Sequence, residues 1–188
     1  MNLSLLIWMA LAVCLAWAVG AYSRLNRMRE QVLRARASLL KYCKQYAAWM
    51  SEWDTQVGLL QDGLASVSVP VSRGGLAPLG NLVAAITALQ QPIEAWESQL
   101  TGEVHQAELG RALDAVQSCV EAIASAPEDL AGALWPTEER NRWLGLVADV
   151  RLRRNRYNVY ASEMNEAVGQ MPAALIARLA GIGPWGQV

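Results

Sequence analysis

The residues with the greatest capacity for chemistry in this sequence are few and far apart. The chain contains one histidine, His105, and three cysteines without CxxC spacing, Cys14, Cys43 and Cys119. One histidine is too few for an HExxH zinc site or for a di-iron bundle with two ExxH motifs. His105 also stands in an acid-rich stretch without the nucleophile-elbow sequence of a hydrolase. We therefore expect a surface histidine and neither a metal site nor a bound cofactor.

Three further patterns have ordinary structural explanations. Glu94 and Glu97 fall on one face of a helix, but paired acids are common on solvated helices and nothing marks them as a general acid and base. The stretch RGGLAPLG, residues 73–80, lacks the Lys and Ser/Thr of a phosphate loop. The odd number and spacing of the cysteines disfavour disulfides and favour a reducing compartment. No catalytic residue and no small-molecule substrate is identified, so an enzyme is not expected.

Charge is distributed unevenly, although the formal net charge is only -1. Residues 24–44 hold seven cations and one acid, whereas residues 45–139 hold two cations and thirteen acids. A second basic cluster lies at residues 140–156. A nucleic-acid-binding domain is normally basic as a whole. The pattern instead indicates local basic surfaces and no nucleic-acid partner.

The N-terminal run LSLLIWMALAVCLAWAVGAY, Leu3 to Tyr22, carries no charge. As a helix it would be about 30 Å long, which matches the hydrocarbon core of a bilayer. A cleaved signal peptide is the rival interpretation, because Ala16-Trp17-Ala18 has the small-x-small form, but no basic segment precedes the run. A lipoprotein site at Cys14 is weaker, because Val13 stands where a small residue is expected. We expect an uncleaved transmembrane anchor over residues 1–23.

Cations directly after the anchor indicate its orientation. The positive-inside rule places them in the cytoplasm and the N-terminus outside. Cations at this position can also attract anionic lipid, by about 1 kcal/mol each. The candidate lipid-binding residues are Arg24, Arg27, Arg29, Arg34 and Arg36, and an ordinary solvated helix face explains them equally well.

Beyond the anchor the hydrophobic periodicity is helical throughout. From Leu25 to Leu64 apolar residues recur at steps of three and four, which is a coiled-coil-like seam. Residues 66–80 are predicted to form a loop, because they contain two prolines and three glycines. Further helices are predicted at residues 82–96, with a possible kink at Pro92, at 103–125, after Trp135-Pro136, and at 173–180. No segment alternates with period two, so no sheet is expected.

These helices predict an all-α fold, in which the transmembrane helix is followed by an elongated antiparallel bundle of about four helices. The predicted organisation is an anchor at residues 1–23, a cytoplasmic bundle at 24–183 and a tail at 184–188.

A polar stripe borders the apolar seam of the helix that ends before Pro172. Asn158 and Asn165 each follow a seam position, Tyr157 and Met164, and Arg154 replaces an apolar residue in the seam. Polar residues beside a seam fix register, because a slipped alignment would bury them unpaired. A docking strip for another protein is the alternative. The candidate interaction or register residues are Arg154, Tyr157, Asn158, Asn165 and Pro172.

The same residues resemble a known family, LemA. Its C-terminal pattern combines R-x-x-Y-N, a second Asn, F-P and L-I-A-x-L-x-G, and the similar residues here are Arg154, Tyr157, Asn158, Asn165, Met171-Pro172 and 175–181. Residues 22–29 are similar to the segment that follows the family's anchor, and residues 109–113 and 126–130 to its central stretch. Met171, Ser23 and Ala126 depart from the usual Phe, Asn and Tyr, and the R-R-x-D-L-I-P-N-L-V element is absent. The chain is identified as a divergent member.

The resemblance implies a bacterial inner-membrane protein with one transmembrane helix, a cytoplasmic helical bundle and no settled catalytic activity. The main functional hypothesis is therefore a non-enzymatic, single-pass scaffold or interaction protein, which acts through protein–protein interaction with itself as a homo-oligomer or with other proteins. A lipid-interacting or membrane-remodelling protein is the alternative, and an enzyme is the least favoured.

Overall fold

The computed structural model of the chain describes residues 3–66, 73–98, 103–125, 137–171 and 173–188. Within these ranges the fold is all-α and contains no strand, as predicted. The helices are α1 (Leu3–Ser66), α2 (Arg73–Ser98), α3 (Glu103–Ala124), α4 (Thr137–Gly169) and α5 (Ala173–Leu179).

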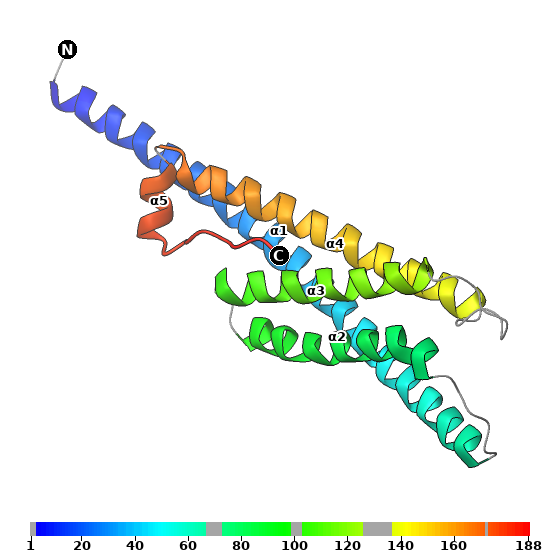
Figure 1. Cartoon of the computed structure of the whole chain (residues 1–188). Coiled ribbons are helices and arrows are strands. Elements are labelled where there is room, and N and C mark those ends of the chain that lie inside the picture. Colours follow the sequence, from blue (N-terminus) through cyan, green and yellow to red (C-terminus); the bar gives the residue numbers. More distant parts are fainter. Residues whose placement is uncertain (1–2, 67–72, 99–102, 126–136, 172) are drawn as a thin grey trace.

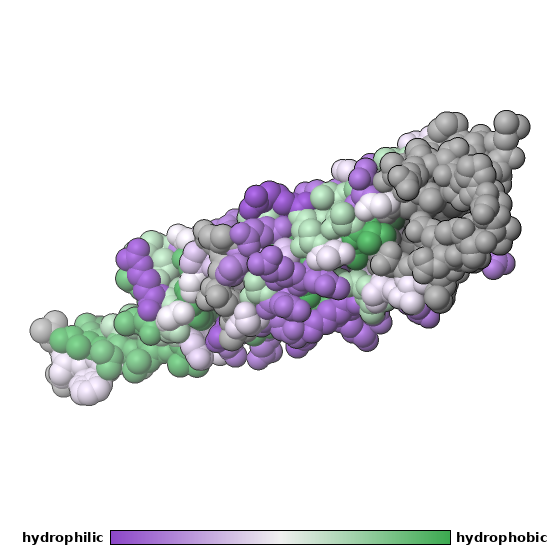
Figure 2. Space-filling model, turned by 60° about the horizontal axis from the view of Figure 1, so that its bottom comes forward, coloured by the Kyte–Doolittle hydropathy of each residue, from purple (hydrophilic) through white to green (hydrophobic). Residues whose placement is uncertain are grey.

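Helix α1 joins the apolar N-terminal run to the bundle without a break (Figure 1). Mean hydropathy reaches 2.1 over an 18-residue window of this helix, and none of that window is buried. Figure 2 shows the N-terminal part as a hydrophobic rod that projects from one end of the molecule. These properties fit a membrane span and equally a signal sequence.

The remaining helices form an elongated antiparallel bundle. Helix α4 runs back along α1, α2 and α3 form a hairpin, and α2 also packs against α1 (Figure 1). Helix α5 contacts both α1 and α4, close to the point where α1 leaves the bundle. The four long helices bury their apolar stripes against one another, which is why a bundle is the stable solution for such sequences.

The predicted seam residues of α1 and α4 pack within the bundle of this chain. Val32, Leu39 and Tyr46 of α1 are buried, as are Tyr157 and Met164 of α4. Because these side chains already fill the core, the described parts of both seams are not available for a coiled coil with another protein. The side chains of the C-terminal seam positions of α1, from Trp53 onward, lie outside the description.

Aromatic side chains pack edge to face at two places in the core. The Trp143 ring lies 4.9 Å from that of Tyr46 and 4.6 Å from that of Trp49, centroid to centroid. The Trp96 ring lies 5.3 Å from that of Tyr157. Edge-to-face pairs of this kind contribute about 0.5–1.5 kcal/mol beyond the area that they bury. They join α1 to α4 at one level and α2 to α4 at another.

The prediction of a loop over residues 66–80 is wrong for most of its length. Helix α1 continues through Ser66 and α2 already begins at Arg73, while residues 67–72 lie outside the described ranges. Gly74 and Gly75 fall in the first turn of α2, where the N–H groups have no intrahelical partner, and α2 continues through Pro78. Composition alone therefore overestimated the loop. Helix α2 also continues through Pro92.

Candidate functional site

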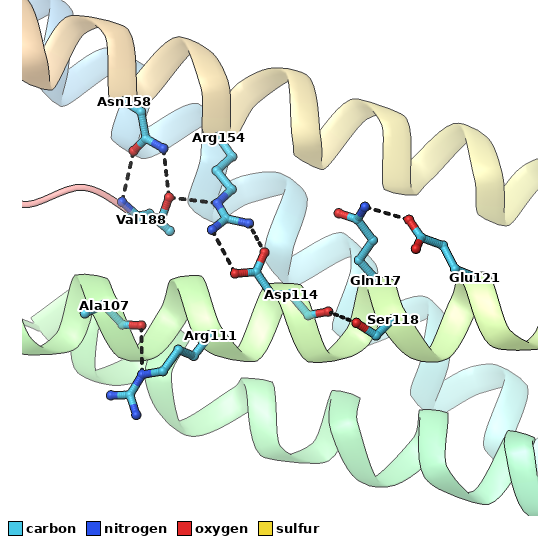
Figure 3. A network of polar contacts seen from close by, with 9 residues as sticks. All are labelled: Ala107, Arg111, Asp114, Gln117, Ser118, Glu121, Arg154, Asn158 and Val188. Carbon is cyan, nitrogen blue, oxygen red and sulfur yellow. Dashed lines mark hydrogen bonds and ion pairs between the residues drawn. The ribbon is translucent and has the colours of Figure 1, made fainter.

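The polar stripe of α4 binds the chain's own C-terminal tail, defined here as residues 182–188. In Figure 3 the side-chain amide of Asn158 faces the backbone of Val188. Its Nδ2 donates to the Val188 main-chain oxygen at 2.8 Å, and its Oδ1 accepts from the Val188 N–H at 2.9 Å. One asparagine thus satisfies both polar groups of one residue, as a neighbouring β-strand would.

Asn165 repeats this pairing one step along the tail. Its Nδ2 donates to the Trp185 carbonyl at 2.7 Å and its Oδ1 accepts from the Trp185 N–H at 2.7 Å. Between Trp185 and Val188, the Gly186 carbonyl accepts a hydrogen bond from the Tyr157 hydroxyl at 3.1 Å.

The spacing of the two asparagines matches the repeat of an extended peptide. Seven residues of α-helix advance about 10.5 Å along the axis. Three residues of extended chain, the separation of Trp185 from Val188, advance about 10 Å. The two amides therefore meet residues 185 and 188 in register, with the tail antiparallel to α4. This match explains why α4 carries two asparagines seven residues apart beside its apolar seam.

The turn that directs the tail onto α4 begins at the end of α5. Gly181 has a φ of 66°. The Ile182 N–H donates to the Ala177 carbonyl at 2.8 Å, and the Gly181 N–H donates to the Arg178 carbonyl at 3.2 Å. This is the pattern of a Schellman cap, in which glycine adopts the left-handed conformation at no steric cost.

Arg154 ties the tail to α3. Its Nε donates to the Val188 main-chain oxygen at 2.7 Å, and its two terminal nitrogens bind the two carboxylate oxygens of Asp114 (Figure 3). The hydrogen bond from Arg154 holds the pKa of Asp114 below its ordinary value. Gly110, one turn before Asp114, leaves room for the tail, because a Cβ there would lie 2.9 Å from the Val188 carbonyl carbon.

Apolar burial holds the other side of the tail. Trp185 is 5 % exposed and Val188 is 6 % exposed. Burial also raises the pKa of Tyr157 to about 12, so its hydroxyl remains a neutral donor at physiological pH.

Four of the five candidate interaction or register residues are therefore brought together on the tail: Arg154, Tyr157, Asn158 and Asn165. Pro172 lies outside the described residues. Gly110, Asp114 and Trp185 were not predicted from the sequence as members of this site. A tryptophan in a short segment rich in glycine and proline was the one sequence signal for the tail. No local pattern marks Asp114 as the partner of Arg154.

The candidate lipid-binding arginines separate into two groups. Arg24, Arg27, Arg29 and Arg34 are exposed on α1. Arg36 is 6 % exposed, donates to the Trp96 carbonyl and stacks on the Trp96 ring, with its Cζ 5.2 Å from the ring centroid. Burial lowers its pKa. Arg36 therefore holds α1 to α2 inside the bundle, where a lipid headgroup cannot reach it.

Three arginines line one groove between α1 and α4. We call this depression of about 290 Å³ the arginine groove; its lining residues are Gln31, Arg34, Ala35, Ser38, Arg153, Arg156 and Tyr160. Arg153 lies with its Cζ 3.6 Å from the Tyr42 ring centroid and donates to the Ser38 hydroxyl at 3.2 Å. Among the described residues, the one acid paired with a groove arginine is Glu30, 4.0 Å from Arg34. Arginine guanidinium groups that line a groove in this way can bind carboxylate or phosphate oxygens.

The residues with catalytic capacity do not converge. The Nδ1 of His105 lies 3.4 Å from a Glu108 oxygen on the same helix, and no group of three His, Cys, Asp or Glu side chains able to hold a metal occurs in the part of the chain that the structure covers. Cys43 is buried, and burial raises the pKa of its thiol to about 12. A neutral buried thiol is a poor nucleophile.

Comparison of this chain with protein-family models, with curated proteins and with solved structures gives no match.

Proposed function

We propose that this chain is a non-enzymatic, single-pass membrane protein that holds a helical interaction module against the bacterial inner membrane. The observation that carries the proposal is the continuity of α1. Its first part is apolar and exposed, and its second part contributes buried residues to the bundle core. Because one helix contains both parts, the bundle is held rigidly at the membrane.

The seven cations of residues 24–44 support a cytoplasmic bundle with the N-terminus outside. Membership of the LemA family, as a divergent member, is part of the proposal. It is supported by the residues that carry the resemblance, because Arg154, Tyr157, Asn158 and Asn165 all form hydrogen bonds to the tail of this chain.

The arginine groove is the surface we propose for partner recognition. The described parts of the seams are occupied within the bundle, so we place the partner outside them. Arg153 and Arg156 form no ion pair within the described residues, and an acidic segment of another protein would supply the missing charge.

Two measurements test this proposal. Protease added to spheroplasts should leave the bundle intact, and the mature chain should retain its first twenty residues. A periplasmic chain that lacks them would refute the anchor. In-cell cross-linking of neighbours should be lost in Arg156→Glu and retained in Arg151→Glu, a charge reversal on the same helix outside the groove. Equal cross-linking by both variants would refute the role of the groove.

A second candidate function is direct interaction with lipid. The exposure of Arg24, Arg27, Arg29 and Arg34 on the segment that follows the apolar run favours it. In the full chain, cross-linking of anionic lipid to this basic segment should decrease as salt is raised. Cross-linking at the segment that does not change with salt would exclude this function.

A further inference from the structure

One corner of the bundle exposes large apolar side chains beside the anchor. Met171, Leu175 and Leu179 are 72 %, 52 % and 90 % exposed. Leu175 and Leu179 are four residues apart and share one face of α5, while Ala177 on the opposite face is buried. We call these three residues the α5 patch. Exposed apolar groups that cluster in this way mark a binding surface or a membrane contact.

The α5 patch lies at the corner of the bundle that is next to the apolar N-terminal run. A recess of about 380 Å³ is lined by Trp17, Gly20, Ala21, Arg24 and Leu25 of α1 and by Ala167, Gln170, Met171 and Ala173 from the end of α4 and the start of α5. Figure 1 shows α5 beside α1 at the end from which the anchor projects. The corner of the bundle therefore reaches the level of the last residues of the apolar run.

The depth of Trp17 places this corner in the membrane interface. Trp17 precedes Tyr22, the end of the uncharged run, by five residues, or about 7.5 Å of helix. Because the uncharged run matches the thickness of the hydrocarbon core, Trp17 lies about 7.5 Å inside the cytoplasmic boundary of that core and Arg24 lies just beyond the boundary. The recess is lined by both residues, so it crosses this boundary when the anchor spans the bilayer.

The charges around the patch suit an anionic leaflet. Arg178 is exposed in the last turn of α5, and Arg24 lines the recess. Amphipathic helices at an interface combine leucines on the lipid side with arginines at the headgroup level. An aqueous environment would instead leave Leu179, at 90 % exposure, fully hydrated.

We propose that the α5 patch is a second membrane contact, in which Met171, Leu175 and Leu179 insert into the cytoplasmic interface of the bilayer that the anchor spans. This inference rests on the proposed function, because it requires the anchor to be in the membrane. The contact would fix the tilt of the bundle, since α1 and the α5 patch hold it at two points. It would also place the tail, which follows α5 directly, beside the membrane surface.

The test is fluorescence quenching of the full chain reconstituted in vesicles of phosphatidylcholine and phosphatidylglycerol with nitroxide-labelled lipids. Leu175→Cys and Leu179→Cys are each combined with Cys14→Ala and Cys119→Ser and labelled with a small fluorophore. Cys43 is left in place, because its buried thiol with a raised pKa reacts slowly. Both positions are exposed, so the substitutions do not disturb the core.

Two controls separate the possible outcomes. Leu152→Cys labels an equally exposed leucine of α4, 57 % exposed and about 22 Å along the helix from Ala167. Native Cys14, labelled in a Cys119→Ser chain, reports insertion of the anchor. We expect quenching at Leu175, Leu179 and Cys14 and none at Leu152. Quenching at Cys14 alone would overturn the inference and leave the anchor standing. Quenching at none of the positions would overturn both, and equal quenching at Leu152 would overturn the specific placement of the patch.

Discussion

Gly110 gives the sharpest test of how the tail is held. In an ordinary helix interior, replacing glycine by alanine stabilises by about 0.5–1 kcal/mol, because alanine loses less conformational entropy. At Gly110 the added Cβ would lie 2.9 Å from the backbone carbon of Val188, which is closer than such atoms approach. The tail must therefore lift away.

The expected magnitude follows from the bonds at Val188. Its main-chain atoms take part in three hydrogen bonds, with Arg154 at 2.7 Å and with Asn158 at 2.8 and 2.9 Å. At about 0.5–1.5 kcal/mol each, their loss costs about 1.5–4.5 kcal/mol, which exceeds the helical gain. Gly110→Ala should therefore weaken the seating of the tail by about 1.5 kcal/mol or more.

The assay is amide hydrogen exchange of the full chain in detergent. The N–H groups of Trp185 and Val188, both bonded to α4 asparagines, report the seating of the tail. Their exchange should accelerate about tenfold in Gly110→Ala, because about 1.4 kcal/mol corresponds to a factor of ten. The matched control is Gly145→Ala, since a Cβ at Gly145 meets nothing within 4 Å and should leave the tail unchanged. Unaltered or slower exchange of the tail in Gly110→Ala would refute the reasoning.

Three further predictions concern the core, the ion pair and the buried thiol. Trp96→Ala should destabilise the bundle by about 3–5 kcal/mol in denaturant titration, because it removes a fully buried ring; a loss below about 1 kcal/mol would contradict its place in the core. Asp114→Asn should lower the melting temperature at neutral pH. Because the pKa of Asp114 is lowered in the fold, the stability that its carboxylate contributes is present above about pH 4 and is lost as the pH falls further. The melting temperatures of the original chain and of Asp114→Asn should therefore converge in acid. A gap that persists there would exclude the carboxylate as its source. Cys43 should react with a thiol reagent far more slowly at pH 8 than Cys119, until the chain is unfolded; equal rates would show that Cys43 is accessible.

The hydrophobic pattern of the sequence was sufficient for the fold class and for most of the helices. Steps of three and four are a local property, and each apolar stripe must be buried against another, so a helical bundle follows from Leu25, Val32, Leu39 and their counterparts alone. The same locality explains the error over residues 66–80. Prolines and glycines there suggested a loop, yet Gly74 and Gly75 lie in the first turn of α2, where the N–H groups have no intrahelical partner to lose.

The tail site depended on tertiary structure. The sequence placed Arg154, Asn158 and Asn165 on one polar stripe beside the seam residue Tyr157, but it left open whether the stripe fixed register or bound another protein. Its partner is a segment twenty to thirty-four residues away along the chain, reached through the turn at Gly181. No periodicity encodes such a return.

Residues that look alike in sequence were likewise separated only by packing. Arg34 and Arg36 belong to one basic run, and one is exposed while the other is buried against Trp96. Side chains two residues apart on a helix point in directions that differ by about 200°. The side from which α2 approaches therefore decides which of the two arginines faces water. Sequence by itself determined the apolar N-terminal segment and most of the helices. The third dimension decided which polar groups bind one another, because those partners come from elements far apart along the chain.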